Sequence, residues 1–283
     1  MTIEMPEAAI LGRELDPALR GRTVATVTLR GCEKLQRIGF INRDLAAFDR
    51  LIGAIVERVA TRGNTIIVKL SGGHNLIISP EYGGEVLLHA SADAVPPRHH
   101  VRVDFDDGSV LTVWIKIMGG MHAIDETGLA EHYVVKRDFD LSHLEPLDPD
   151  LTLEAFGRLL AGCATQLKPV LVGRDAVVVG LGNSTFQDVL FRARLHPRRR
   201  ACDLRPDEVE ALYAALRLVV EERLRLGGKA SFVDLYGRAG GYEPAMGAAF
   251  KGRACPACDT PIERLALGGG EVYLCPACQP AGG

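Results

Sequence analysis

The chain of 283 residues is long enough for two or three compact units, and its 47% hydrophobic and 24% charged residues are normal for a globular protein. Its net charge of −3 argues against a uniformly basic surface, but residues 168–256 hold 15 basic and 10 acidic side chains, so any face for a polyanion lies there. No apolar run reaches the ~18 residues that cross a membrane, and the start MTIEMPEAA lacks a signal-peptide pattern. With no visible disulfide framework, we expect a cytoplasmic protein.

The first half of the chain predicts one helix followed by strands. Residues 6–20 place apolar side chains near helical spacing, and this helix is expected to break or end near Asp16-Pro17. Short β-branched segments then run to about residue 130, separated by turns such as SGG, YGG and DDG. They read TVATVTL, AIVERVA, NTIIVKL, HNLIISP, HVRVDF and VLTVWIKI. No helix between them is long enough for a parallel crossover, so we predict an antiparallel β-sandwich domain over residues 1–140.

The second half changes period after the Pro/Asp-rich linker DLSHLEPLDPDLT at 140–152. Helices are predicted in LTLEAFGRLLAG, LKPVLVG, STFQDVLFRARL and PDEVEALYAALRLVVEERLRLGG. The last closes at Gly227-Gly228, because glycine commonly ends helices. We therefore expect an α+β multidomain chain, with a helical domain at 149–228 and a small cysteine module at 245–283.

The cysteine module contains Cys255, Cys258, Cys275 and Cys278 in the pattern C-x2-C-x16-C-x2-C. Two CxxC turns joined by a hairpin bring four thiolates around one ion, which predicts a zinc ribbon. Four cysteines leave no open coordination position, so the single Zn2+ would be structural and would stabilise a module too small for its own core. The alternatives are chance spacing or a redox CxxC pair.

A glycine-rich stretch, GLGN, lies between an apolar run and a helix expected to begin near Ser184 or Thr185. Glycines allow close backbone approach, and the exposed N–H groups of a helix start can bind phosphate. Taken alone, the stretch could also be a simple corner between two helices with a solvated basic face.

The order of motifs in this region resembles the formamidopyrimidine-DNA glycosylase and endonuclease VIII family. The shared motifs are Lys168-Pro169, an apolar run at 177–179, Gly180-Leu181-Gly182-Asn183, Asp188, Leu190-Phe191 and His196-Pro197. The family also begins with a helix and a β-sandwich, contains a helix–two-turn–helix module, and ends in a zinc ribbon of this spacing. The resemblance therefore covers nearly the whole chain.

The resemblance implies a DNA repair protein that binds double-stranded DNA with a damaged or abasic site, excises the base and cleaves the strand as a lyase. It implies phosphate contacts by the second half, which position the protein without reading sequence. The expected DNA-binding residues are Lys168, Asn183, Arg192, Arg253 and Met118. We expect a monomer.

The amino terminus departs from the family pattern. Where the family has a nucleophilic proline, this chain has Ile3, although Glu4, Pro6 and Glu7 fit the surrounding motif. We therefore predict that the α-amino group of Thr2 forms the imine after removal of Met1, or that of Met1 if it is retained, with Glu4 and Glu7 as catalytic carboxylates. Glu4 could alternatively be only a carboxylate that complements a helix start.

Other family side chains are also altered. The family's lysine after the early strands falls at Asn64, and the side chains that fill the space of a flipped base fall near Met118 and at Tyr82. The arginine of the zinc hairpin falls at Gly270. Since inserted side chains offset the cost of base flipping, we expect lyase activity at abasic sites to exceed excision of damaged bases. The alternatives are a non-enzymatic binder of damaged DNA and an unrelated zinc-ribbon protein.

Overall fold

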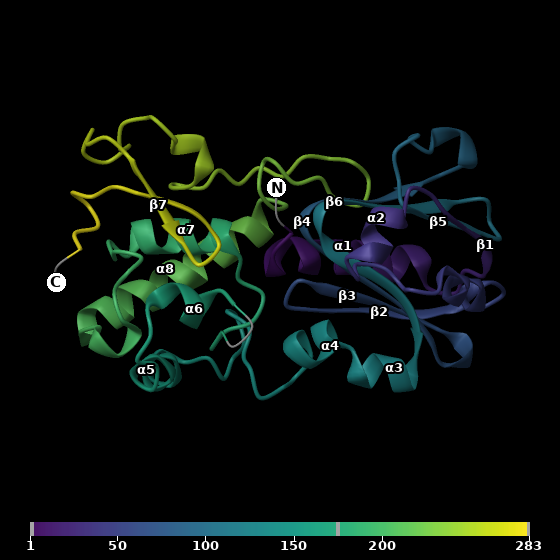
Figure 1. Cartoon of the computed structure of the whole chain (residues 1–283), viewed down its shortest axis with the longest axis horizontal. Coiled ribbons are helices and arrows are strands. Elements are labelled where there is room, and N and C mark those ends of the chain that lie inside the picture. Colours follow the sequence, from purple (N-terminus) through teal and green to yellow (C-terminus); the bar gives the residue numbers. More distant parts are fainter. Residues whose placement is uncertain (1–2, 174–175, 282–283) are drawn as a thin grey trace. The chain divides into compact units, whose positions relative to one another are not determined.

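The computed structural model describes residues 3–173 and 176–281. The chain forms two compact units (Figure 1). The β unit comprises residues 1–140 and 226–241, and the helical unit comprises residues 141–225 and 242–283. The helices and the cysteine module, which the sequence predicted as two domains, thus lie in one unit, and the segment after the last long helix packs with the β-sandwich.

The β unit contains an antiparallel sheet of six strands in the order β1-β5-β6-β4-β3-β2. The strands are β1 Val24–Leu29, β2 Val56–Arg62, β3 Thr65–Leu70, β4 His74–His89, β5 Val101–Phe105 and β6 Val110–Asp125. The two edges meet just before β1 and β2, where Thr23 and Ile55 form an isolated bridge and the Val24 amide donates to the Ala54 carbonyl at 2.9 Å. The sheet therefore closes on itself, and the predicted antiparallel sandwich is confirmed.

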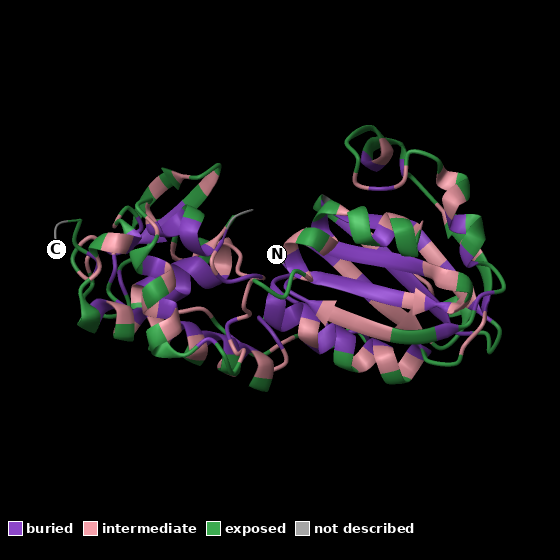
Figure 2. Ribbon diagram, turned by 90° about the horizontal axis from the view of Figure 1, so that it is seen from below, coloured by how far each residue is buried: buried purple, intermediate pink, exposed green. Residues whose placement is uncertain are grey.

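The strand sequences explain which faces are buried. In β5, VRVDF, the valines and Phe105 are buried, and the residues between them are partly exposed. This alternation is the period-2 pattern of a strand with one face towards solvent. In β3, TIIVKL, five of the six residues are buried, so this strand is covered on both faces. Buried residues accordingly run along whole strands (Figure 2).

The first helix, α1, spans Met5–Leu19 and packs against β2. Glu4 is its N-cap and forms a capping box with Glu7, in agreement with the E-x-P-E start. The helix ends at Leu19, close to the end expected near Asp16-Pro17, and Pro17 lies inside its last turn. Contact with β2 is close at Gly12, where a Cβ atom would lie 2.4 Å from the Thr61 Cγ2 atom.

We predict that Gly12→Ala destabilises the protein, although in an open helix this change stabilises by about 1 kcal/mol. The added methyl group collides with Thr61, and overpacking of this kind costs about 1–3 kcal/mol. Chemical denaturation of Gly12→Ala, Thr61→Ala and the double variant would measure the coupling. We expect the double variant to be less destabilised than the two single changes together, whereas additive effects would contradict a direct collision.

Short helical segments join the strands of the β unit. They are α2 Glu33–Arg37, η1 Leu45–Leu51, η2 Ser71–Gly73, η3 Ala92–Ala94, α3 Glu126–Glu131 and α4 Tyr133–Asp138. The α3–α4 pair covers a cluster in which Leu129 and Val134 pack on Ile67 and Ile77 of the sheet. The sequence did not predict these segments, since each has seven residues or fewer.

A histidine pair next to this cluster makes the stability of the β unit depend on pH. His122 of β6 lies 4.6 Å from His132 between ring centroids, and burial together with the charge of His132 lowers the pKa of His122 to about 4. The unfolded chain, with a pKa of about 6.5, binds this proton first, so the stabilisation is complete above pH 6.5 and is lost as the pH falls towards 4.

We expect the free energy of unfolding to fall by at most about 3 kcal/mol from this group between pH 7 and pH 4. Denaturant titrations at several pH values would measure the fall. His122→Gln should flatten the profile, and His99→Gln, in the loop before β5, should leave it unchanged. An unchanged profile in His122→Gln would refute the assignment.

The helical unit contains four helices and a hairpin within its described residues. They are α5 Leu153–Ala161, α6 Leu167–Leu171, α7 Asn183–Arg192, α8 Pro206–Arg225, β7 Glu263–Leu267 and β8 Gly270–Leu274, with the turns η4 Ala201–Asp203 and η5 Ala248–Phe250. The helix after GLGN begins at Asn183, one residue earlier than expected. None of the described helices is long and apolar enough to cross a membrane.

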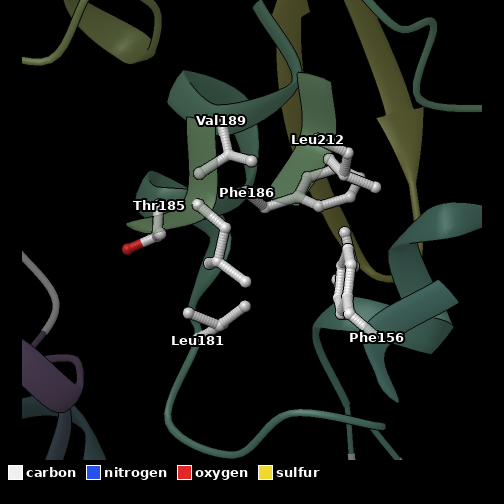
Figure 3. A pocket seen from close by; sticks show the side chains of 8 residues that line it. Phe156, Leu181, Thr185, Phe186, Val189 and Leu212 are labelled. Carbon is white, nitrogen blue, oxygen red and sulfur yellow. The ribbon is translucent and has the colours of Figure 1, made fainter. Parts of the chain in front are cut away.

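Helices α5, α7 and α8 enclose a small apolar pocket (Figure 3). Phe156, Leu181, Phe186 and Leu212 point into it from different elements. The pocket wall includes Thr185, whose hydroxyl accepts a hydrogen bond from the fully buried Arg223. The pocket is part of the core that holds α7 in place.

Candidate functional site

The carboxylates predicted at the amino terminus lie together at the start of α1. Glu4 and Glu7 are 2% and 0% exposed. One oxygen of Glu7 accepts from the Glu4 amide at 3.1 Å, and the other accepts from the Lys229 amide at 3.3 Å. The ammonium of Lys229 lies 4.0 Å from a Glu4 carboxylate oxygen. The structure thus brings both predicted carboxylates to one place and adds a lysine that the sequence interpretation missed.

The predicted nucleophile at Thr2 lies outside the described residues. Ile3, which occupies the position of the family's proline, is 1% exposed and contributes an apolar side chain to the core. It offers no reactive group. Lys229 could have been noticed only as a lysine directly after the Gly227-Gly228 helix end, a position that carries no chemical signal of its own.

The cation Arg137 lies beside Asn64, the position where the sequence pattern places the family's lysine. The guanidinium of Arg137 donates to the Asn64 side-chain oxygen and to Asp138 at 2.6 Å. Asp138 is 1% exposed and also accepts from the Thr65 hydroxyl at 2.5 Å. Arg137 comes from α4, which is distant in sequence, so the pattern around Asn64 could not reveal it.

Met118 lies at a bulged part of the β4–β6 ladder. Its side chain is among the exposed large hydrophobic ones, at 47%. Its backbone pairs with Tyr82, and the register shifts on both sides of that pair. The two positions that correspond to the family's inserted side chains therefore lie opposite each other in one ladder.

Lys168 and Asn183 both contact the hairpin of the cysteine module. The Lys168 ammonium donates to the Leu267 carbonyl at 2.6 Å, and the Asn183 amide nitrogen donates to the Glu271 carbonyl at 2.8 Å. Lys168 is buried, which lowers the pKa of its amine. These two predicted phosphate contacts, 15 residues apart, are thus held at either side of the β7–β8 turn.

Two further hydrogen bonds fix the cysteine module to α7 and to the segment that follows α7 in the chain. Gln187 accepts from the Tyr273 amide at 2.7 Å, and Gln279 donates to the Leu195 carbonyl at 2.8 Å. Both glutamine side chains are buried. The cysteine module is therefore packed onto the helices, and each part helps to hold the other in place.

The two predicted arginine contacts differ in their surroundings. Arg192 donates to Asp188 at 2.9 Å and to the Tyr242 hydroxyl at 3.3 Å, and Tyr242 donates to Asp188 at 2.5 Å. This network holds the chain after α8 against α7, and burial next to Asp188 raises the pKa of Tyr242. Arg253, by contrast, is exposed just before the first cysteine pair.

The four cysteines of the module converge as the spacing predicts. Their sulfur atoms all lie within 4.8 Å of one another. The Cys258 sulfur lies 3.5 Å from those of Cys275 and Cys278, and the Cys255 sulfur lies 3.9 Å from that of Cys278. A tetrahedral zinc ion with bonds of about 2.3 Å requires sulfur atoms about 3.8 Å apart. The Thr260 hydroxyl beside Cys258 lowers the pKa of that thiol to about 6, which favours the thiolate that a metal binds. Among the described residues, this is the group that can hold a metal ion.

Known proteins match this chain in both sequence and fold. The family description "Formamidopyrimidine-DNA glycosylase N-terminal domain" matches residues 2–114, and "Formamidopyrimidine-DNA glycosylase H2TH domain" matches residues 143–234. The formamidopyrimidine-DNA glycosylase of Symbiobacterium thermophilum is 32% identical and covers 98% of this chain and 89% of its own. That of Chloroflexus aggregans is 29% identical over 98% of both chains.

Solved structures agree with these matches. The MutM (Fpg) protein of Thermus thermophilus has a TM-score of 0.80, 28% identity and coverage of 99% of this chain and 100% of its own. The Lactococcus lactis Fpg bound non-covalently to DNA containing an abasic site has a TM-score of 0.80 at 22% identity, over 98% and 99% of the two chains, and shows the shared fold. The motifs, both domain matches and the full-length relatives agree: this chain belongs to the formamidopyrimidine-DNA glycosylase family.

Proposed function

We propose that this protein is a DNA glycosylase with abasic-site lyase activity, acting on double-stranded DNA that contains a damaged base or an abasic site. The observation that carries the proposal is the buried carboxylate pair Glu4 and Glu7 at the start of α1, in a chain that matches the family in both its domains. The named relatives are formamidopyrimidine-DNA glycosylases, and the Lactococcus lactis protein binds abasic DNA.

The reaction needs an amine and a group that moves protons. An amine attacks the sugar C1′ atom and forms an imine, after which a base removes a C2′ proton and the 3′ phosphate leaves. Glu4 would transfer the protons, and Glu7 holds the backbone around it through its two hydrogen bonds. The α-amino group of Thr2 remains the amine that the sequence predicts.

The helical unit supplies the grip on DNA. Lys168, Asn183 and Arg253 would contact phosphates, with Arg192 supporting the same surface through Asp188, and Met118 of the β unit would enter the space left by a flipped base. Phosphate contacts give affinity without sequence specificity, as a search for rare lesions requires. Lys168 and Asn183 contact the cysteine hairpin, so the grip depends on that hairpin being folded.

One structural Zn2+ bound by Cys255, Cys258, Cys275 and Cys278 would hold the hairpin. The sulfur separations fit a tetrahedral ion, and four thiolates leave no open position for catalysis. We further propose that the protein acts as a monomer in the bacterial cytoplasm, where the DNA is.

Strand cleavage tests the enzyme proposal directly. A duplex with one abasic site and a duplex with one formamidopyrimidine base would be incubated with the protein at neutral pH, and the products separated on a denaturing gel. We expect β-elimination at the abasic site to be faster than release of the damaged base, because the side chains that stabilise a flipped base are altered. Tight binding of abasic DNA with no cleavage above the protein-free rate would instead identify a non-enzymatic binder.

A further inference from the structure

The amine closest to the catalytic carboxylate among the described contacts belongs to a side chain and not to the chain terminus. Lys229 follows the glycine pair that ends α8 and is 4% exposed. It belongs to the segment 226–241, which packs in the β unit with Glu4. A lysine so completely buried is unusual unless it is paired.

The segment that carries Lys229 is fixed to the β unit at several points. The Leu88 amide of β4 donates to the Leu235 carbonyl at 2.9 Å, and the Leu235 amide donates to Glu14 of α1 at 2.9 Å. The segment also folds tightly on itself, since a Cβ atom on Gly240 would lie 2.5 Å from the Lys229 carbonyl oxygen. The position of Lys229 is therefore set by the β unit.

Glu7 links Lys229 to the start of α1 through hydrogen bonds. Its carboxylate accepts from the Glu4 amide with one oxygen and from the Lys229 amide with the other, at 3.1 and 3.3 Å. This bridge leaves the Lys229 ammonium 4.0 Å from Glu4. A buried ion pair is weak evidence for stability, because apolar residues of similar size commonly serve as well. Its position beside the expected reaction site favours a chemical role.

We propose that Lys229 supplies the amine that forms the imine with the abasic sugar. The position of the family's proline holds Ile3, whose nitrogen is a peptide amide after Thr2 and whose buried side chain carries no amine, so the amine comes from another residue. Lys229 is the described lysine placed beside Glu4. This proposal rests on the proposed lyase function and assigns its nucleophile to Lys229, in place of the α-amino group of Thr2 that the sequence predicts.

Glu4 and Lys229 together account for the proton transfers and the new bond to the sugar. Glu4 takes a proton from the Lys229 ammonium, and the neutral amine adds to the C1′ aldehyde of the open sugar. Protonated Glu4 returns its proton to the carbinolamine hydroxyl, which leaves as water, and a protonated imine forms. The Glu4 carboxylate then takes the C2′ proton, and the electron pair of that C–H bond forms the C2′–C3′ double bond as the C3′–O bond breaks and the 3′ phosphate leaves. Water finally hydrolyses the imine and frees the lysine.

Borohydride trapping on a duplex with one abasic site tests the proposal, because it reduces the imine to a stable covalent link. Wild-type protein, Lys229→Arg and Lys229→Gln would be compared, with Lys34→Arg on the exposed face of α2 as the matched control. Arginine keeps the positive charge but stays protonated, so it cannot attack. We expect both Lys229 variants to lose about 100-fold or more of the trapped yield, as nucleophile removal does, and the control to trap normally.

Peptide mapping of the trapped wild-type complex is independent of whether any variant folds. An adduct on Lys229, with trapping retained in protein acetylated at its amino terminus, supports the proposal. An adduct on the terminal amine, with normal trapping by Lys229→Arg, overturns it and leaves the lyase function intact. No adduct at all, together with no strand cleavage, overturns both.

Discussion

Cys258→Ser is expected to unfold the cysteine module and abolish DNA binding while the β unit stays folded. Zinc contributes about 10–16 kcal/mol to the folding of modules of this kind, and loss of one thiolate removes most of it. The hairpin would then no longer meet Lys168 and Asn183, which donate to its Leu267 and Glu271 carbonyls. Elemental analysis, circular dichroism and fluorescence anisotropy with an abasic duplex would measure the three consequences.

Cys202→Ser is the matched control, since Cys202 lies in the helical unit but outside the metal cluster. It should keep one zinc per chain and full affinity. Treatment of the wild type with a strong chelator should reproduce the Cys258→Ser result. Protein purified without chelator that contains no stoichiometric zinc, yet binds DNA normally, would contradict the role of the module.

DNA affinity is expected to fall by about 10³-fold or more between 50 and 200 mM salt, if six or more phosphates are neutralised. The basic side chains of residues 168–256 provide these charges in a chain whose net charge is −3. Anisotropy titrations at several salt concentrations would give the slope. An affinity that stays flat across this range would contradict a grip based on phosphates.

Asn183→Ala and Lys168→Ala separate the phosphate grip from lesion recognition. Both should weaken binding to abasic and undamaged duplexes by the same factor, and Lys168→Ala should also reduce the salt slope by about one ion. Lys34→Ala in the β unit should change neither. A variant that loses affinity only for abasic DNA would show that these residues read the lesion and do not merely hold the backbone.

The sequence predicted the elements with a strong periodic pattern. All six strand segments are strands, because β-branched alternation over five or more residues has few other solutions. The strands β4 and β6 are longer than predicted, at 16 residues each, since their SPEYGG and IMGGM stretches resemble turns by composition but continue the ladder through bulges. The α1 helix runs two residues past Pro17, where Leu19 is buried and the Asp16 carboxylate accepts a hydrogen bond from the Val59 amide.

The residues of the candidate site also differ in whether the sequence could predict them. The cysteine tetrad could be predicted because its ligands lie in two short motifs whose spacing fixes the geometry. Glu4 and Glu7 were found from a local motif, and they form the capping box at the start of α1. Lys229 and Arg137 were missed because they reach Glu4 and Asn64 from 225 and 73 residues away, through packing that no local pattern encodes.

The lyase activity is tested most directly by asking whether the wild-type protein forms a covalent complex with abasic DNA in the presence of sodium borohydride. We predict a band of protein linked to the labelled strand. The band should require borohydride and should disappear when the abasic site is replaced by an intact nucleotide. It should also be lost in Glu7→Leu, because the Glu4 and Lys229 amides then lose their shared acceptor. Tight binding of abasic DNA without any trapped complex would contradict the account, because a lyase of this family must pass through the imine.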